Sequence, residues 1–236
     1  MIGKGKSISH GVAALEYDLA KEIDGQAAAT EIARHELYGC TGAEMVQEMK
    51  PYFTDFPNVK NNCLRFEVSP SIEESSSFTD ADWAELGNDF MQRMGLVNHQ
   101  YIIIKHSRTE SKKEQAHLHI LANRISLSGE LYRDNWIGKR ATEAANAIAK
   151  ERNFVQSQDI GKANKEEIKE AMNSVLKKMQ GFDLTKFQEE LGKLGFKIRE
   201  ARASTGKLNG YYVTARSGTE YKASEIGKGY TFAHIE

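Results

Sequence analysis

The chain has 236 residues, 40% of them apolar, so it can bury a substantial core, and its net charge of −1 argues against a generally basic nucleic-acid binder. It contains no apolar run approaching the roughly 20 residues of a membrane helix, and no apolar signal segment follows Met1. Cys40 and Cys63 are too few for a disulfide framework or a zinc–thiolate cluster, which predicts a cytoplasmic protein without a membrane partner.

The first part of the chain is predicted to be mostly helical. The predicted elements are helices over 9–22, 27–38 and 41–50, a strand over 63–69, and a helix from Thr79 to Gly95. In the first helix, Val12, Leu15 and Leu19 share one face. Thr41 followed by Glu44 three residues later predicts a capping box at the start of the third helix.

The second part alternates strands and helices. The predicted elements are strands over 99–106 and 115–126, a short return strand over 130–132, a helix over 136–152, a polar break over 156–163, helices over 164–179 and 183–194, and strands over 196–201 and 209–215. Short turns between strands, with helices interspersed, predict an α+β fold: a central antiparallel sheet with helices packed around it. We expect one domain over 1–236, with 164–236 as a candidate C-terminal subdomain.

Four of the seven histidines fall on the two strands over 99–106 and 115–126, and three of them, His106, His117 and His119, lie toward the turn that would join the strands. His117 and His119 are two residues apart and project from the same strand face. If the strands pair as a hairpin, His106 at the end of the first strand can join them around one ion. Three neutral imidazoles with open positions left over suit a catalytic divalent-metal site on the sheet. The alternative is a set of ordinary core histidines held by hydrogen bonds.

Polar residues near these histidines suggest a phosphate ligand. A basic cluster beside the hairpin consists of Lys105, Arg108, Lys112 and Lys113, and a second lies late in the chain at Lys197, Arg199, Arg202 and Lys207. Such clusters are most often solvated surface, and only the first lies beside a candidate site. Asn123 comes four residues after His119, on the same strand face, so its amide either orients a phosphate or makes an ordinary strand hydrogen bond.

Tyr17 is a candidate nucleophile. At about 100° per residue it points nearly opposite the apolar face of its helix, beside Ala13 and Ala20, as a plain surface tyrosine also would. A phenolate that attacks a DNA phosphodiester forms a phosphotyrosine ester, and a metal held by histidines would offset the charge that develops on the phosphate. The chain has no His-Glu-x-x-His helix and no phosphate-binding glycine loop, which argues against a zinc protease and a P-loop enzyme.

The run His106, then His117-Leu-His119-Ile-Leu-Ala-Asn123-Arg124, resembles the three-histidine motif of the mobilization relaxases, the strand-transferring DNA nucleases of plasmids and mobile elements. Ala14-Leu-Glu-Tyr17-Asp-Leu is similar to the N-terminal segment that carries the family's catalytic tyrosine. The resemblance runs over most of the chain.

The resemblance implies a metal-dependent enzyme that nicks and rejoins one DNA strand at a transfer origin through a covalent 5′-phosphotyrosine. It implies Tyr17 as the nucleophile and His106, His117 and His119 as the metal ligands. We expect DNA contacts from Lys105, Asn123 and Arg124. The expected cofactor is Mg²⁺ or Mn²⁺, and the expected partners are single-stranded DNA and accessory mobilization proteins. Unpaired bases are expected to stack on Tyr211 and Tyr212.

Two departures from the family pattern concern the first ligand. Arg108 stands where the family often has an acid, and the spacer between His106 and His117 is long. His10 is a rival nucleophile. Two other functions remain open: a rolling-circle replication initiator with the same chemistry, and a non-catalytic DNA-binding module with structural histidines. The last segment has no clear stop signal, which allows a further domain beyond Glu236.

Overall fold

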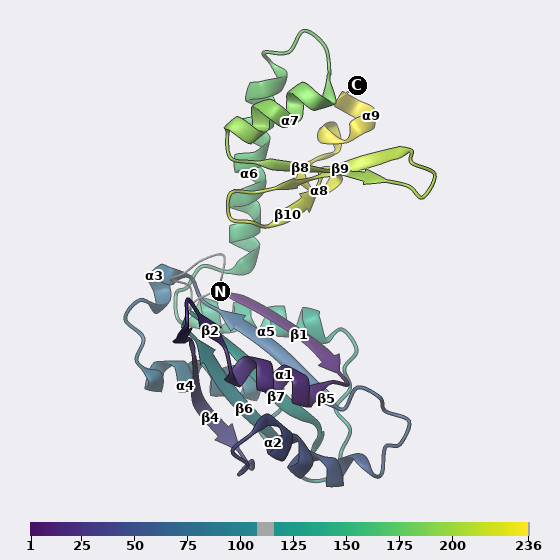
Figure 1. The fold of residues 1–236 in the computed structure, drawn as a ribbon. Helices are drawn as coiled ribbons and strands as arrows, with labels where there is room; N and C mark the ends of the chain where they lie inside the picture. Colours follow the sequence, from purple (N-terminus) through teal and green to yellow (C-terminus); the bar gives the residue numbers. More distant parts are fainter. Residues whose placement is uncertain (108–115, 236) are drawn as a thin grey trace. The chain divides into compact units, whose positions relative to one another are not determined.

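In the computed structural model, which describes residues 1–107 and 116–235, the N-terminal part of the chain is built on a five-stranded antiparallel sheet (Figure 1). Its strand order is β1-β5-β7-β6-β4. The strands are β1 (Ile2–Ile8), β4 (Ala29–His35), β5 (Cys63–Ser69), β6 (His99–His106) and β7 (His117–Ser126). This sheet, with helices around it, confirms the α+β class expected from the sequence.

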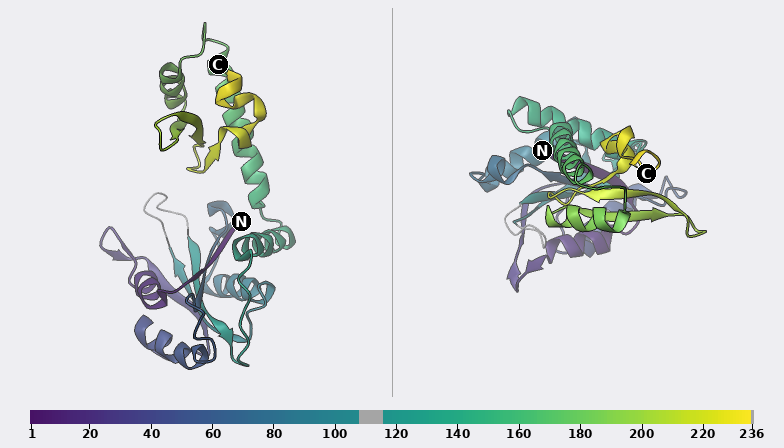
Figure 2. Two further views of the ribbon diagram at one scale, coloured as in Figure 1. Left: turned by 90° about the vertical axis from the view of Figure 1, so that its right-hand side faces the viewer. Right: turned by 90° about the horizontal axis from the view of Figure 1, so that it is seen from above.

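Helices cover both faces of the sheet, as the left view of Figure 2 shows. On one face α4 (Asp80–Arg93) and α5 (Ile137–Glu151) pack against the alternate residues of the inner strands, which include Leu64, Phe66, Val68, Ile103, Leu118 and Ile120. On the other face α1 (Gly11–Leu19) and α2 (Gly42–Met49) cover Cys63, Ile102, Ile104 and Leu121. Full burial of one such aliphatic side chain stabilises the fold by about 1.5–3 kcal/mol, so the two helical layers hold the inner strands rigidly.

Two helices of this unit begin at capping boxes, the first of which the sequence predicts. Thr41 accepts a hydrogen bond from the backbone N–H of Glu44, whose carboxylate accepts one from the backbone N–H of Thr41. Thr79 and Asp82 form the same arrangement at the start of α4. Gly95, with φ of 72°, ends that helix in the left-handed conformation that glycine adopts without strain.

The helix predicted over 27–38 is wrong, because this segment forms β4, preceded by the small hairpin of β2 (Glu22–Ile23) and β3 (Gln26–Ala27). Its alanines, glutamate and arginine favour a helix locally, but pairing with β6 at the edge of the sheet overrides that preference. The face predicted for α1 is also corrected: Val12 is 38% exposed, whereas Asp18 is buried in its place. The return strand over 130–132 is reduced to a single bridge between Ile125 and Leu131.

The polar break predicted over 156–163 is wrong as well, because α6 (Ser157–Leu176) runs through it. The segment is polar and contains Gly161, and one glycine lowers helix stability by about 1 kcal/mol. The helix tolerates this because its C-terminal part packs in a core. That core also takes in α7 (Leu184–Lys193) and the sheet of β8 (Lys197–Arg202), β9 (Leu208–Thr214) and β10 (Glu220–Lys222). The short elements are η1 (Lys50–Phe53), α3 (Ile72–Ser75), α8 (Ala223–Ile226), η2 (Lys228–Tyr230) and α9 (Phe232–Ile235).

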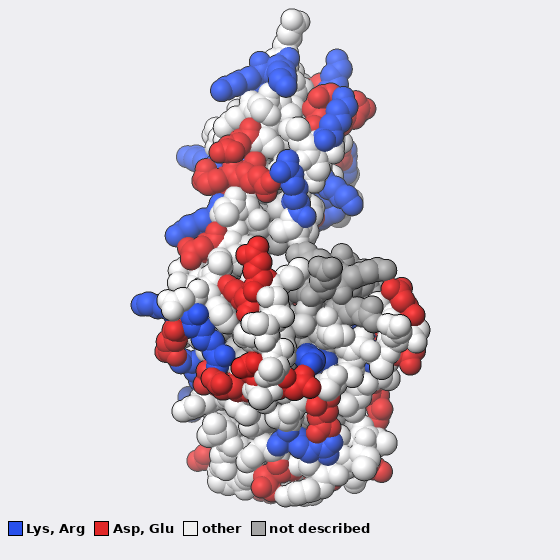
Figure 3. All heavy atoms as spheres, turned by 90° about the vertical axis from the view of Figure 1, so that its left-hand side faces the viewer, with Lys and Arg blue, Asp and Glu red and all other residues white. Residues whose placement is uncertain are grey.

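The chain divides into two compact units, Met1–Ser157 and Gln158–Glu236. The second unit begins before residue 164, where the sequence analysis placed the candidate subdomain, and the assignment of the whole chain to one functional domain stays a prediction. Among the helices that the structure describes, none has the length and apolar character needed to cross a membrane. On the face shown in Figure 3, basic and acidic side chains are interspersed, so attraction for a polyanion there must come from local groups.

Candidate active site

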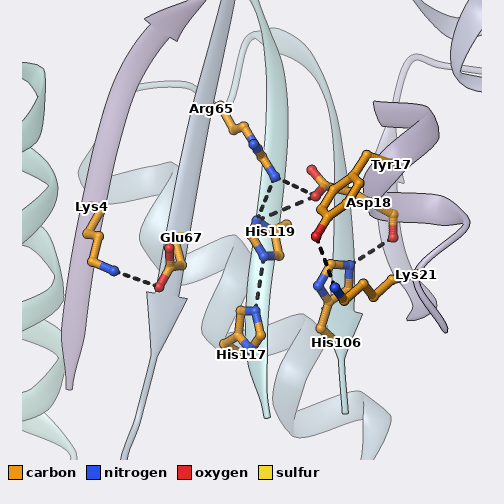
Figure 4. Close-up of polar contacts among 9 residues, drawn as sticks. All are labelled: Lys4, Tyr17, Asp18, Lys21, Arg65, Glu67, His106, His117 and His119. Atoms are coloured by element: carbon orange, nitrogen blue, oxygen red, sulfur yellow. Dashed lines mark hydrogen bonds and ion pairs between the residues drawn. The ribbon is translucent and has the colours of Figure 1, made fainter. Parts of the chain in front are cut away.

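The three histidines of the predicted metal site converge on one face of the sheet (Figure 4). His106 at the end of β6 lies directly opposite His117 at the start of β7, and His119 follows two residues later on the same face. One nitrogen of each ring lies within 4.8 Å of the other two. The Nε2 atoms of His117 and His119 are 3.0 Å apart. The hairpin therefore forms, and it brings the three rings together as the sequence predicts.

The surroundings of His119 and His106 favour their neutral forms. Burial lowers the pKa of His119 to about 2, and the neighbouring histidines, Arg65 and Lys4 act in the same direction. Burial also lowers the pKa of His106. The Nε2–H of His106 donates to the backbone carbonyl of Asp18 at 2.8 Å, which leaves its Nδ1 as the lone-pair nitrogen. Neutral rings with lone pairs are what a metal ion requires.

The separation of two of these nitrogens fits a divalent ion. Two metal–nitrogen bonds of about 2.0–2.1 Å, separated by about 90–110°, would place the two nitrogens about 2.8–3.4 Å apart. The 3.0 Å separation of the His117 and His119 Nε2 atoms agrees with this range. Two ring nitrogens at this distance, both facing one point, repel each other unless a proton or a cation lies between them. Three protein ligands leave further coordination positions for a substrate.

Tyr17 lies in the last turn of α1, beside this cluster. It is 57% exposed, and Figure 4 shows its ring extending from the helix with the hydroxyl toward the histidines. The ammonium group of Lys21 donates to the Tyr17 hydroxyl oxygen at 2.9 Å. The charge of Lys21 also lowers the pKa of His106, so ammonium, phenol and imidazole are neighbours. A donor at this oxygen stabilises the negative charge that it carries as a nucleophile.

His10, the rival nucleophile, lies at the opposite end of α1. Seven residues at about 1.5 Å per residue separate it from Tyr17 by roughly 10 Å along the helix axis. Its side chain lines another cavity, of about 660 Å³, together with Phe53 and Cys63. The structure therefore brings Tyr17 to the histidine cluster, and His10 to a different place.

Asp18 and Arg65 complete the site, and neither was predicted as a site residue. Asp18 is only 1% exposed, and its carboxylate forms an ion pair with Arg65. Burial raises the pKa of Asp18, and Arg65 opposes that shift. Arg65 lies 3.4 Å from the Nδ1 of His119, and the Asp18 carboxylate lies 3.8 Å from it. Arginine can only donate, so a His119 that binds metal through Nε2 and carries its proton on Nδ1 would turn that proton toward Asp18.

The three predicted DNA contacts have structural partners instead. Asn123 is fully buried: its amide donates to the Gln100 side chain and accepts from the backbone of Ile125, both at 2.9 Å. Arg124 forms an ion pair with Asp134 at 2.7 Å. Lys105 pairs with Asp80, and because neighbouring strand residues alternate between faces, it points away from the side of His106. Contact of these three residues with DNA stays a prediction.

The structure also shows the partners of the late basic cluster and the surroundings of the two tyrosines expected to stack on bases. Arg108, Lys112 and Lys113 lie outside the described residues. In the late cluster, Arg199 pairs with Glu220 and Arg202 with Glu200. Tyr211 is 2% exposed, so its predicted stacking on bases is wrong, because its ring faces are covered by the core of its unit. The guanidinium group of Arg199 lies 4.1 Å from the ring centre of Tyr212 and covers one of its faces.

A histidine triad on the central strands of an α+β sheet, with an exposed tyrosine beside it, has the parts of a metal-dependent phosphoryl-transfer enzyme whose nucleophile is a protein side chain. Residues 17–154, more than half of the chain, match the family described as relaxase, MobA/VirD2-like, nuclease domain. The chain belongs to this family, which confirms the resemblance, and it is a DNA relaxase: an endonuclease and strand transferase. The matched segment contains Tyr17 and all three histidines.

Among solved structures, one that is similar to the chain is described as the conjugative relaxase TrwC in complex with oriT DNA, in a metal-bound structure. It shares 12% sequence identity and a TM-score of 0.38, covering 88% of this chain and 74% of that chain. A likeness at this level leaves the family assignment resting on the sequence match. No curated protein matches the chain.

Proposed function

We propose that this relaxase nicks one DNA strand at a specific site of a transfer origin and rejoins it through a covalent phosphotyrosine at Tyr17, with a divalent metal held by His106, His117 and His119. The observation that carries the proposal is the convergence of three imidazole nitrogens, all within 4.8 Å of one another, beside the helical turn that holds Tyr17. The cluster supplies a place for a cation, and the tyrosine supplies the nucleophile.

In the proposed reaction the Tyr17 hydroxyl, which is exposed, gives its proton to solvent and its oxygen attacks the scissile phosphorus. The bond from phosphorus to the 3′ oxygen breaks, and that oxygen leaves as a 3′-hydroxyl after it takes up a proton. The 5′ end of the strand stays on Tyr17 as a phosphodiester, and attack by a 3′-hydroxyl reverses the step and rejoins DNA. Exposure of Tyr17 allows the strand to reach it, and the Lys21 ammonium stabilises the oxygen while it carries negative charge.

The three histidines would hold the ion through one nitrogen each, and a bound cation would polarise the scissile phosphate. Asp18 would support this set by accepting the Nδ1 proton of His119 and by receiving the Nε2 proton of His106 at its carbonyl. Of the two expected ions, Mn²⁺ suits an all-nitrogen donor set better than Mg²⁺, which prefers oxygen ligands. The proposed partners are single-stranded origin DNA and accessory mobilization proteins, in the cytoplasm.

The test is a denaturing-gel assay of the protein with labelled single-stranded DNA from the element's own origin and Mn²⁺ or Mg²⁺. We expect a labelled band at the mass of the protein that disappears in Tyr17→Phe. Tyr38→Phe is the matched control, because Tyr38 is 76% exposed and lies outside the site, and this variant should retain the band. A band that persists in Tyr17→Phe and disappears in His10→Ala would overturn the assignment of the nucleophile.

A further inference from the structure

A groove beside the histidine cluster opens on the outer strands of the sheet. It has a volume of about 240 Å³, and its polar lining consists of Lys4, Lys6, Arg65, Glu67 and His119. β1 is the edge strand and β5 its neighbour, and the Lys4–Glu67 ion pair of 2.9 Å shows that the charged residues of both strands project from the histidine face (Figure 4). The groove is thus continuous with the proposed active site.

The charges in this groove are unevenly balanced. Lys4 is paired with Glu67, and Arg65 with Asp18. Lys6 is exposed, and its side chain has no ion pair or hydrogen bond with any residue that the structure describes. One positive charge is therefore left over in the groove.

The position of Lys6 is unfavourable for the protein alone. In the register of β1 and β5, Lys6 lies directly opposite Arg65, so two positive side chains share one face of neighbouring strands. Like charges in this arrangement destabilise a sheet. Lysine is common on edge strands, where it prevents pairing with other chains, but that role does not require a second positive charge opposite it. An anion between Lys6 and Arg65 would turn the repulsion into attraction.

We propose that this groove binds a backbone phosphate of the single-stranded DNA substrate next to the scissile one, with Lys6 as a positioning residue. The inference rests on the proposed function, which supplies the DNA. Two strand spacings of about 4.8 Å separate β1 from β7, so Lys6 is about 10 Å from the strand of His119 and contacts a flanking phosphate, while the scissile phosphate lies at the histidines. In this arrangement the DNA strand crosses β7 and β5 toward the edge of the sheet.

The proposal is tested by binding of fluorescently labelled oligo(dT) in fluorescence anisotropy over a series of KCl concentrations. We expect Lys6→Ala to weaken binding by roughly three- to tenfold at low salt and to reduce the slope of log K against log salt by about 0.7, the value for one phosphate contact on a single strand. Lys6→Arg, which keeps the charge, should restore both quantities. Lys139→Ala is the control, because Lys139 is an exposed lysine of α5, on the other side of the sheet.

Lys6→Glu separates a role in DNA binding from a structural one. This variant places a negative charge opposite Arg65, so its thermal unfolding midpoint should equal or exceed that of the wild type while oligo(dT) binding falls below that of Lys6→Ala. Unchanged binding and salt slope in Lys6→Ala, with the Tyr17 adduct still formed on origin DNA, would overturn this inference and leave the proposed function intact. A wild-type protein that binds neither oligo(dT) nor origin DNA would overturn both.

Discussion

The packing of α5 on β1 predicts the effect of one methyl group. Gly3 lies on the strand that carries Lys4 and Lys6, and a Cβ atom built there would lie 2.4 Å from the backbone oxygen of Ala141 and 2.6 Å from the Cβ of Ala145. Favourable contacts between such atoms are about 3.5–4.0 Å long, so Gly3→Ala requires a separation of roughly 1 Å between strand and helix. Rotation of a side chain cannot relieve a clash with a backbone oxygen.

Two opposing effects determine whether Gly3→Ala raises or lowers the free energy of unfolding. Backbone entropy and strand propensity favour alanine over glycine by about 0.5–1 kcal/mol. Overpacking costs about 1–3 kcal/mol, and this site lies at the upper end because the helix itself must move. We expect a net loss of about 2 kcal/mol, which for a unit of this size lowers the thermal midpoint by roughly 4–8 °C.

Intrinsic tryptophan fluorescence during urea or thermal unfolding measures this loss, because Trp83 is buried in the same core and Trp136 is exposed. The control is Gly192→Ala in α7, where a Cβ would meet no atom within 4 Å. Helix propensity alone acts there, so that variant should be more stable by about 0.5–1 kcal/mol, measured by circular dichroism. A Gly3→Ala protein that unfolds at or above the wild-type midpoint would refute the packing argument.

The remaining predictions concern the site and a buried thiol. His117→Ala and His119→Ala should each lower the bound Mn²⁺ measured by elemental analysis, and chelation should abolish the Tyr17 adduct; full metal content in both variants would remove them from the ligand set. Asp18→Asn should weaken Mn²⁺ binding by about 10- to 100-fold in calorimetry, because this variant removes the negative charge that lies 3.8 Å from the Nδ1 of His119; an unchanged affinity would show that the carboxylate does not support the ring. Burial raises the pKa of Cys63 to about 12, so iodoacetamide should label exposed Cys40 and spare Cys63 in the native protein at pH 8, as read by mass spectrometry. Because the thiol ionises near 9.0 when unfolded, Cys63 should also destabilise the native state as pH rises from about 9 toward 12, and Cys63→Ala should lack this component.

Local sequence was sufficient for much of the site. The two-residue spacing of His117 and His119 determines that both project from one face of any strand. The apolar alternation of β5, the consecutive apolar residues of β6 and β7, and the caps at Thr41 and Thr79 all depend on neighbours within a few residues. These elements were therefore predicted close to their observed bounds. The position of Tyr17 on the exposed side of its helix follows from the helical period in the same way.

Tertiary structure decided what depends on residues far apart in the chain. The segment of β4 favours a helix by composition, and only pairing with β6 makes it a strand. Asn123 and Arg124 follow the histidines in sequence, yet their partners, among them Gln100 and Asp134, use up their polar groups. Asp18, Arg65 and Lys6 belong to the site or its groove because α1 and β1 are placed beside β5 and β7. The periodicity of the sequence predicts which face of its helix or strand a side chain lies on. The residue that it contacts on that face is determined by the packing of segments far apart in the chain.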